Sequence, residues 1–167
     1  MIPGTSSRPA AAVAALLEAR GETLAVAESS AGGLINAALV AVPGASKWYL
    51  GGAIIYTPKG RGVLLGLSKD DLADVRSATE GFALILASRT REKLGATWGL
   101  GETGASGPTG NRYGDAPGHA CIAVAGPKGA VITVETGSAE REANMWAFAE
   151  RALRLLEECI RGQTPNP

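Results

Sequence analysis

The sequence predicts a single-domain α/β protein, a three-layer α/β/α sandwich built on a mixed β-sheet. Two patterns predict this fold: short apolar segments alternate with helical segments along the chain, and two strand-like segments flank a four-residue loop at 126–129. A length of 167 residues is enough for one domain with its own core. We expect the domain to span residues 8–161, with flexible ends at 1–7 and 162–167.

The first half of the chain predicts two helices and two strands. Residues 9–20 are apolar on one side and are followed by Gly21, which is typical of an amphipathic helix with a glycine C-cap. The other elements of this half are a strand at 23–27, a helix at 34–40 and a strand at 48–56. Pro58, Gly60 and Gly62 then interrupt the second strand.

The second half predicts two longer helices and a hairpin. Ser77 and Glu80 have the spacing of a capping box, so we expect them to open a helix that ends at Gly95. The remaining elements are strands at 119–125 and 131–135 and a helix at about 139–160.

Composition excludes several classes of protein. Lys plus Arg and Asp plus Glu both number 16, so bulk charge favours neither a nucleic-acid partner nor a membrane surface. Two distant cysteines and one histidine do not predict a metal site. The start lacks a signal-peptide pattern, and no apolar run approaches the roughly 20 residues of a membrane span, so we expect a cytoplasmic protein. The G-x-G-x-x-G pattern at 99–104 begins within a predicted strand and precedes no helix, which argues against a dinucleotide site.

Three glycine-rich polar stretches, at 28–33, 51–61 and 103–110, adjoin predicted strand ends, where α/β proteins bind ligands. Ser29 lies at a turn from strand to helix, and helix-start N–H groups there can bind a phosphate or an oxyanion. An ordinary serine cap followed by packing glycines is the alternative. The backbone donors of 103–110 can hold a phosphate or ribose, and a plain connecting loop is the alternative.

Other polar residues have two interpretations each. Tyr56 can stack on an aromatic base, and Lys59 or Arg61 can meet a phosphate, or these cations can simply be solvated. His119 and Cys121 share a strand face, but two potential ligands do not make a metal site, so we interpret them as a partly buried histidine beside a core thiol.

Three blocks of the sequence resemble the motifs of one known family. Residues 27–33, A-E-S-S-A-G-G, resemble the family's A-E-S-C-T-G-G block. Residues 43–56 carry P-G-A-S, an aromatic residue, G-G and a final tyrosine, and residues 103–108 resemble T-G-x-A-G-P. Because their order and spacing agree, the chain is similar to the nicotinamide-nucleotide amidohydrolase family, also known as the CinA C-terminal domain.

The resemblance implies a metal-independent serine amidohydrolase without a cofactor. Its reaction converts nicotinamide mononucleotide and water to nicotinic acid mononucleotide and ammonia, so the implied partner is a small nucleotide. By resemblance Ser29 is the nucleophile, Tyr56 and Thr103 shape the pocket, and Arg141 contacts the phosphate. The other residues implied to bind substrate are Glu28, Ser30, Gly32, Gly33, Gly104, Ala105, Ser106 and Gly107.

This chain departs from the family pattern at the expected base. The family lysine aligns with Arg61, whose guanidinium, with a pKa above about 12, accepts no proton at neutral pH. Lys59 can take its place if the segment bends inward, which gives an active amidase. Otherwise the chain is a nucleotide-binding relative that has lost hydrolysis or acts on another substrate, and Ser30 and Ala31 replace the family's Cys and Thr.

Two expectations concern how the domain is used. Relatives often carry this domain fused behind a larger one, so a regulatory or structural module is a third hypothesis. Three tryptophans in a small domain, Trp48, Trp98 and Trp146, favour a homo-oligomer with a subunit interface.

Overall fold

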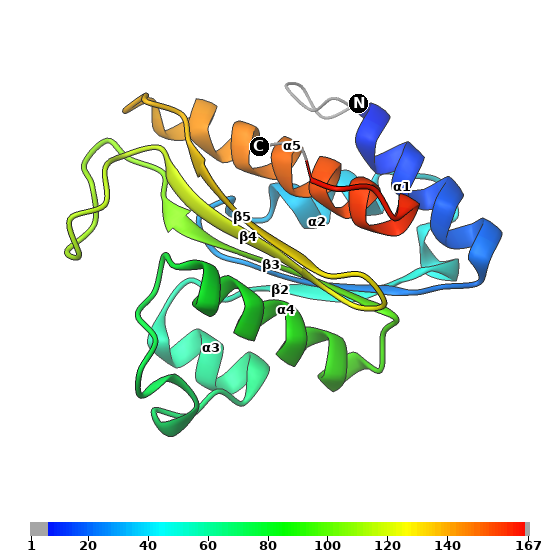
Figure 1. The fold of residues 1–167 in the computed structure, drawn as a ribbon, viewed down its shortest axis with the longest axis horizontal. Coiled ribbons are helices and arrows are strands. Elements are labelled where there is room, and N and C mark those ends of the chain that lie inside the picture. The colour runs from blue at the N-terminus through cyan, green and yellow to red at the C-terminus, as the bar shows by residue number, and fades with distance from the viewer. Residues whose placement is uncertain (1–6, 166–167) are drawn as a thin grey trace.

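A computed structural model describes residues 7–165 as a five-stranded mixed sheet between two layers of helices (Figure 1). The strands are β1 (Leu24–Glu28), β2 (Tyr49–Ile54), β3 (Trp98–Ala105), β4 (His119–Ala125) and β5 (Ala130–Glu135). The helices are α1 (Ser7–Arg20), α2 (Leu34–Val40), α3 (Pro58–Leu65), α4 (Glu80–Leu94) and α5 (Arg141–Arg161), with short 3-10 turns at Ala45–Lys47 and Asp70–Leu72.

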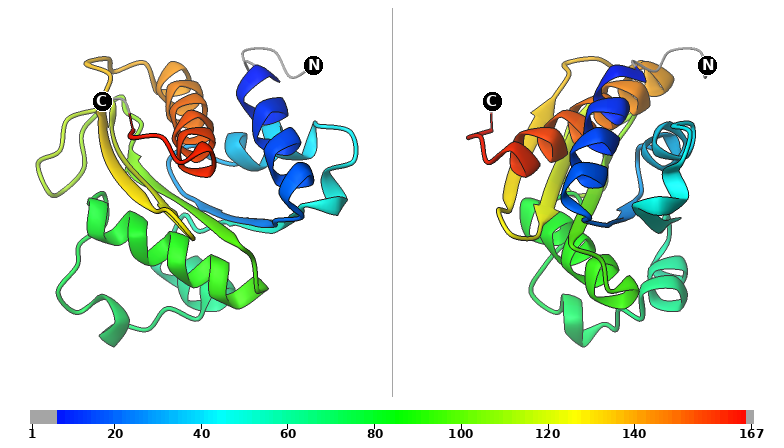
Figure 2. Two further views of the ribbon diagram at one scale, coloured as in Figure 1. Left: turned by 45° about the vertical axis from the view of Figure 1, so that its right-hand side comes forward. Right: turned by 90° about the vertical axis from the view of Figure 1, so that its right-hand side faces the viewer.

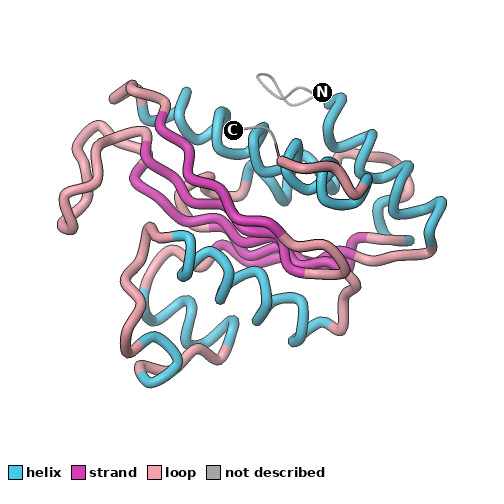
Figure 3. Tube along the Cα trace, in the orientation of Figure 1, coloured by secondary structure: helices cyan, strands magenta, loops and turns pink. Residues whose placement is uncertain are grey.

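The order of strands in the sheet is β2-β1-β3-β4-β5. β1 runs parallel to both β2 and β3, whereas β4 and β5 complete the sheet in antiparallel pairs. Because β1 and β3 are parallel neighbours, their carboxyl ends meet at one edge of the sheet, which is where ligands bind in open α/β sheets. The segment between β3 and β4 extends from this same edge, and Figure 3 shows it as loop.

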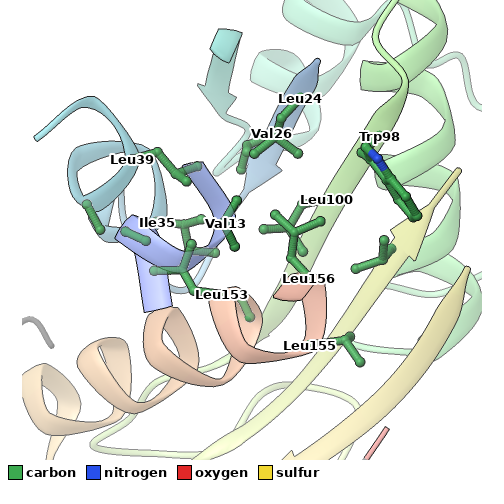
Figure 4. Close-up of a cluster of buried hydrophobic side chains, with 14 of the residues drawn as sticks. Val13, Leu24, Val26, Ile35, Leu39, Trp98, Leu100, Leu153, Leu155 and Leu156 are labelled. Carbon is green, nitrogen blue, oxygen red and sulfur yellow. The ribbon is translucent and has the colours of Figure 1, made fainter. Parts of the chain in front are cut away.

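Helices α1, α2 and α5 cover one face of the sheet, and α3 and α4 cover the other (Figures 1 and 2). Alternate residues of β1 and β3 face the first layer, and their apolar side chains pack against α1, α2 and α5 (Figure 4). The buried members include Leu24, Val26, Leu100, Leu153 and Leu156. Glu28 and Glu102 continue the same alternation, so two carboxylates follow the apolar residues on this face.

The opposite face of β3 lies directly against α4. A Cβ atom added at Gly99 would stand 2.0 Å from the Ala87 carbonyl oxygen, and one at Gly101 would stand 2.2 Å from that of Ala83. These glycines therefore allow a helix and a strand to approach closely. This packing role accounts for the G-x-G pattern, and the prediction that its first glycines lie within a strand is confirmed.

The predicted strands and most predicted helices are confirmed, with two corrections. The capping box at Ser77 is wrong, because α4 begins at Glu80 and Thr79 is its N-cap, accepting a hydrogen bond of 3.2 Å from the Phe82 N–H. The segment after β2 is not a mere interruption but forms α3, which Thr57 caps through a 3.0 Å bond from the Gly60 N–H.

The expected flexible ends fall largely outside the described residues, which begin at Ser7 in α1 and stop at residue 165. Within this described part, no helix is both long enough and apolar enough to span a bilayer. Trp48 and Trp98 are each 1% exposed and belong to the core, so they do not supply the expected subunit interface. Association between copies of the chain therefore stays a prediction that rests on other surfaces.

Candidate active site

A pocket of about 480 Å³ opens where β1 and β3 end. Its walls come from the turn after β1, the loop after β3, the start of α3 and the start of α5. This volume lies within the range of small-molecule binding sites. Of the residues predicted for the site, those that line this pocket are Ser29, Ser30, Tyr56, Arg61, Thr103, Gly104, Ala105, Ser106, Gly107 and Arg141.

The turn after β1 is held by the carboxylate of Glu102, which is fully buried. Its oxygens accept hydrogen bonds from the backbone N–H groups of Ser29, at 3.0 Å, and Ala31, at 2.9 Å. The hydroxyl of Ser30 donates to the same carboxylate. By contrast, the Ser29 hydroxyl makes no hydrogen bond within residues 7–165, so Ser30 is the serine of this turn that contacts a proton acceptor.

Glu28 occupies the start of α2 in a similar way. Its carboxylate accepts from the backbone N–H groups of Ile35, at 3.2 Å, and Asn36, at 2.9 Å, and from the Asn36 side chain. The expectation that helix-start N–H groups bind a phosphate or an oxyanion is therefore wrong for these donors, because Glu28 and Glu102 already use them. The negative charge that faces these N–H groups is therefore supplied by two side chains of the protein, as in a helix capped by a carboxylate.

Burial sets the protonation of both carboxyl groups. Desolvation raises the pKa of Glu102 to about 7, although the bonds from Ser30, Ala31 and Ser29 oppose it, and nearby Glu28 raises it further. Burial likewise raises the pKa of Glu28 above its ordinary value. A carboxyl group with a pKa near neutrality can exchange a proton in the range where general bases work best.

Stability is expected to fall between pH 4.5 and about 7 because of Glu102. In this window the folded chain keeps a proton that the unfolded chain has released, so the free energy of unfolding decreases by roughly 3 kcal/mol as pH rises, and this loss is complete above pH 7. Urea unfolding of the wild type at pH 5 and pH 8 measures the loss. In Glu102→Gln the pH dependence should shrink, and an unchanged dependence would contradict the assignment.

Guanidinium groups supply the positive charge of the pocket. Arg141 donates to the Tyr56 hydroxyl at 2.7 Å and to the Gly107 carbonyl at 2.5 Å. These bonds connect the start of α5 to the segment before α3 and to the loop after β3. Arg61 lies over the Phe82 ring, 5.2 Å from its centroid, and donates to the Ser77 hydroxyl at 3.1 Å. No aspartate or glutamate of the described chain lines this pocket, so it favours an anionic ligand.

Several predicted residues lie away from the pocket. Lys59 is exposed at the start of α3 and is not part of the lining, so the structure does not bring its amine to Ser29. Glu28 is buried beneath the turn, where it bonds to the start of α2, and it is not part of the lining. Gly32 packs towards Met145 of α5 and Gly33 towards Ile54, where added Cβ atoms would come within 2.6 and 2.9 Å. These two glycines shape the turn rather than line the pocket.

The backbone next to Ser77, which lines the pocket, is held by contacts that the sequence analysis did not predict. Ala78 has a left-handed backbone, with φ 58°. Its N–H donates to the Thr103 hydroxyl at 3.2 Å, and its carbonyl accepts from His119 Nε2 at 2.9 Å. Thr103 and His119 therefore fix the backbone of Ala78 in this strained conformation. Ser77 is the residue before Ala78, so the same two bonds help to position the hydroxyl that Arg61 contacts.

Comparison with known proteins places the chain in a family. The model of the CinA C-terminal domain matches residues 6–160. The chain belongs to the CinA C-terminal domain family. A CinA-like protein of Synechococcus elongatus is 39% identical over 132 residues, covering 79% of this chain and 31% of the relative. A CinA-like protein of Gloeobacter violaceus is 39% identical over 154 residues, covering 90% of the chain and 36% of the relative. The chain thus spans about a third of the length of the curated relatives it matches.

Solved structures of proteins described as competence or damage inducible share this fold. The competence damage-inducible protein A of Klebsiella pneumoniae superposes with a TM-score of 0.87 at 24% identity, covering 96% of this chain and 99% of that one. The competence/damage inducible protein of Agrobacterium tumefaciens gives a TM-score of 0.83 at 25% identity, covering 93% of this chain and 96% of that one. The three-layer α/β architecture of this chain is therefore the one found in these solved structures.

Proposed function

We propose that the pocket binds a pyridine mononucleotide and hydrolyses its carboxamide, converting nicotinamide mononucleotide and water to nicotinic acid mononucleotide and ammonia. The observation that carries this proposal is the joining of two serines, Ser29 and Ser30, with the guanidiniums of Arg61 and Arg141 in one pocket. A serine hydroxyl is a nucleophile suited to an amide carbonyl, and guanidinium groups suit a phosphate. The motif resemblance specifies the nucleotide, and it assigns the attack to Ser29.

Nucleotide binding without hydrolysis is the second candidate function, and a specific observation favours it. Hydrolysis needs a group that accepts the proton of the attacking hydroxyl. Lys59 is exposed outside the pocket, and Arg61, which does line it, stays protonated. A site with the binding residues but without the family lysine can retain affinity after losing turnover.

Ammonia release and binding, measured side by side, separate the two functions. Purified wild type is incubated with nicotinamide mononucleotide, release is followed by a coupled ammonia assay, and affinity is measured by calorimetry. Binding with release supports the amidase, whereas binding without release supports the second function. Neither binding nor release would reject both. Lys59→Ala is included because loss of release in this variant would show that its ammonium group reaches the pocket.

Arg141→Met is expected to weaken binding of nicotinamide mononucleotide by about 10- to 100-fold, since a charge-assisted contact with phosphate contributes roughly 1.5–3 kcal/mol. Binding of nicotinamide riboside, which lacks the phosphate, should change much less. Arg154→Met on the same helix is the matched control, because Arg154 pairs with Glu150 at the surface, 2.7 Å away. Equal weakening for nucleotide and riboside would argue against a phosphate contact.

A further inference from the structure

We propose that the pocket holds two phosphate groups, one at Arg141 and the other in a second subsite made of two guanidinium groups and two hydroxyl groups. These four groups all line the pocket and belong to Arg61, Ser77, Arg112 and Tyr113. The second subsite rests on the proposed function and narrows its substrate class, because the preferred ligand then carries one phosphate more than nicotinamide mononucleotide does.

The four side chains of the second subsite adjoin one another. Arg61 donates to the Ser77 hydroxyl at 3.1 Å, and Arg112 donates to the Tyr113 hydroxyl at 2.8 Å. The bond from Arg112 lowers the pKa of Tyr113 although burial opposes it, and both Ser77 and Arg61 add to the lowering. Because hydrogen bonds and neighbouring charges shift a pKa only at short range, the two pairs lie close together at the mouth of the pocket.

The loop that carries Arg112 and Tyr113 is held in place by its own bonds. The Asn111 side chain accepts from the N–H groups of Tyr113, at 3.0 Å, and Asp115, at 3.1 Å. Arg76 donates to Asp115 at 2.6 and 3.1 Å, which fastens the loop to the segment before α4 and lowers the pKa of Asp115 to about 2. The Arg76 guanidinium also lies over the Tyr113 ring, 5.0 Å from its centroid. Tyr113 is therefore positioned before a ligand arrives.

The guanidinium groups of the pocket are not neutralised by carboxylates. Within residues 7–165, Arg61, Arg112 and Arg141 form no ion pair. By contrast Arg76, which lies outside the lining, is paired with Asp115. A phosphate monoester carries a charge of about −1.5 to −2 at pH 7, so one such group matches the two guanidiniums of the second subsite. The hydroxyls of that subsite can donate to its remaining oxygens.

Arg141 belongs to a different part of the wall. Its guanidinium donates to the Tyr56 hydroxyl and to the Gly107 carbonyl, and in the described part of the chain it makes no hydrogen bond to the second subsite. The two anion positions are therefore built from separate sets of contacts. A mononucleotide with a single phosphate fills one of them and leaves the other open.

Binding of inorganic phosphate to the full chain tests the second subsite. Radiolabelled phosphate is measured by equilibrium dialysis at neutral pH, both alone and with saturating nicotinamide mononucleotide. We expect the wild type to bind two phosphates alone and to retain one beside the nucleotide. Arg112→Met and Arg61→Met should weaken the retained phosphate by about 10- to 100-fold, whereas Arg141→Met should weaken the one that the nucleotide displaces.

Arg154→Met is the matched control, because Arg154 pairs with Glu150 away from the pocket, and it should bind both phosphates as the wild type does. Folding of each variant is checked by circular dichroism. Arg112 is exposed and bonds to its neighbour Tyr113, so Arg112→Met keeps the test valid even if Arg61→Met does not fold.

Three results would overturn the second subsite: a single bound phosphate in the wild type, displacement of both phosphates by the nucleotide, or two phosphates that Arg112→Met leaves unchanged. A further arm uses acetate as the competitor. If acetate displaces the retained phosphate as well as unlabelled phosphate does, the assignment to a phosphate is rejected in favour of a carboxylate.

The outcomes also separate the second subsite from the proposed function. If two phosphates bind and the variants each lose one, but nicotinamide mononucleotide neither binds nor yields ammonia, the second subsite stands and the proposed substrate is rejected. If ammonia is released but the wild type binds one phosphate only, the amidase stands and the second subsite is rejected.

Discussion

Gly101→Ala is expected to destabilise the fold by roughly 3 kcal/mol or more, because the new methyl group meets backbone that has no room to retreat. Its Cβ would lie 2.2 Å from the Ala83 carbonyl oxygen and 2.6 Å from the Ala87 nitrogen, both in α4. Since a domain of this size has a total stability of about 5–15 kcal/mol, such a loss removes a large share of it. Urea unfolding followed by circular dichroism measures the change.

Gly62→Ala is the matched control for this substitution. Gly62 lies in α3, and an added Cβ would stand 3.6 Å from the Leu67 carbonyl oxygen, an ordinary contact distance. Alanine favours a helix over glycine by up to about 1 kcal/mol, so this variant should be as stable as the wild type or slightly more stable. Similar destabilisation in both variants would show that the close packing of β3 on α4 is not the cause.

Glu102→Leu is expected to cost roughly 3–5 kcal/mol at pH 7. The apolar side chain leaves three donors, the N–H groups of Ser29 and Ala31 and the Ser30 hydroxyl, without their acceptor inside the protein. Leucine also avoids the free-energy cost of burying a carboxyl group, which recovers part of this loss. The expected decrease in the free energy of unfolding is therefore smaller than the sum of the penalties for three unpaired donors.

Denaturation with urea compares Glu102→Leu with a surface control. Glu92→Leu makes the same exchange at an exposed position of α4 and should stay within about 0.5 kcal/mol of the wild type. If Glu102→Leu were equally mild, the carboxylate would not be what organises the turn after β1.

The pattern of apolar residues was enough to predict the layers and nearly every element, because burial against a sheet imposes clear periodicities. It failed at α3, where Pro58, Gly60 and Gly62 suggested a break. That helix is stabilised by its Thr57 cap and by the burial of Leu65, and proline is well tolerated in a first turn. The spacing of Ser77 and Glu80 predicts a capping box, but the Ser77 hydroxyl accepts a hydrogen bond from the distant Arg61, and Thr79 caps the helix.

Residues of the site that belong to local motifs could be predicted from the sequence, whereas a residue whose role depends on strand pairing could not. Ser29, Thr103 and Arg141 were identifiable from motifs, and all three line the pocket. Glu102 was missed because its role depends on the pairing of β1 with β3, which places it beside a turn 71 to 73 positions away. A single carboxylate within an otherwise buried, glycine-rich strand was the available signal.

The two buried carboxylates at the turn also determine how the pocket meets a ligand. Glu28 and Glu102 hold the backbone between β1 and α2 from inside the protein, so its shape owes nothing to an external anion. An incoming molecule finds this wall already rigid and loses little conformational entropy by ordering it. Selectivity at this wall therefore comes from complementarity to a fixed surface.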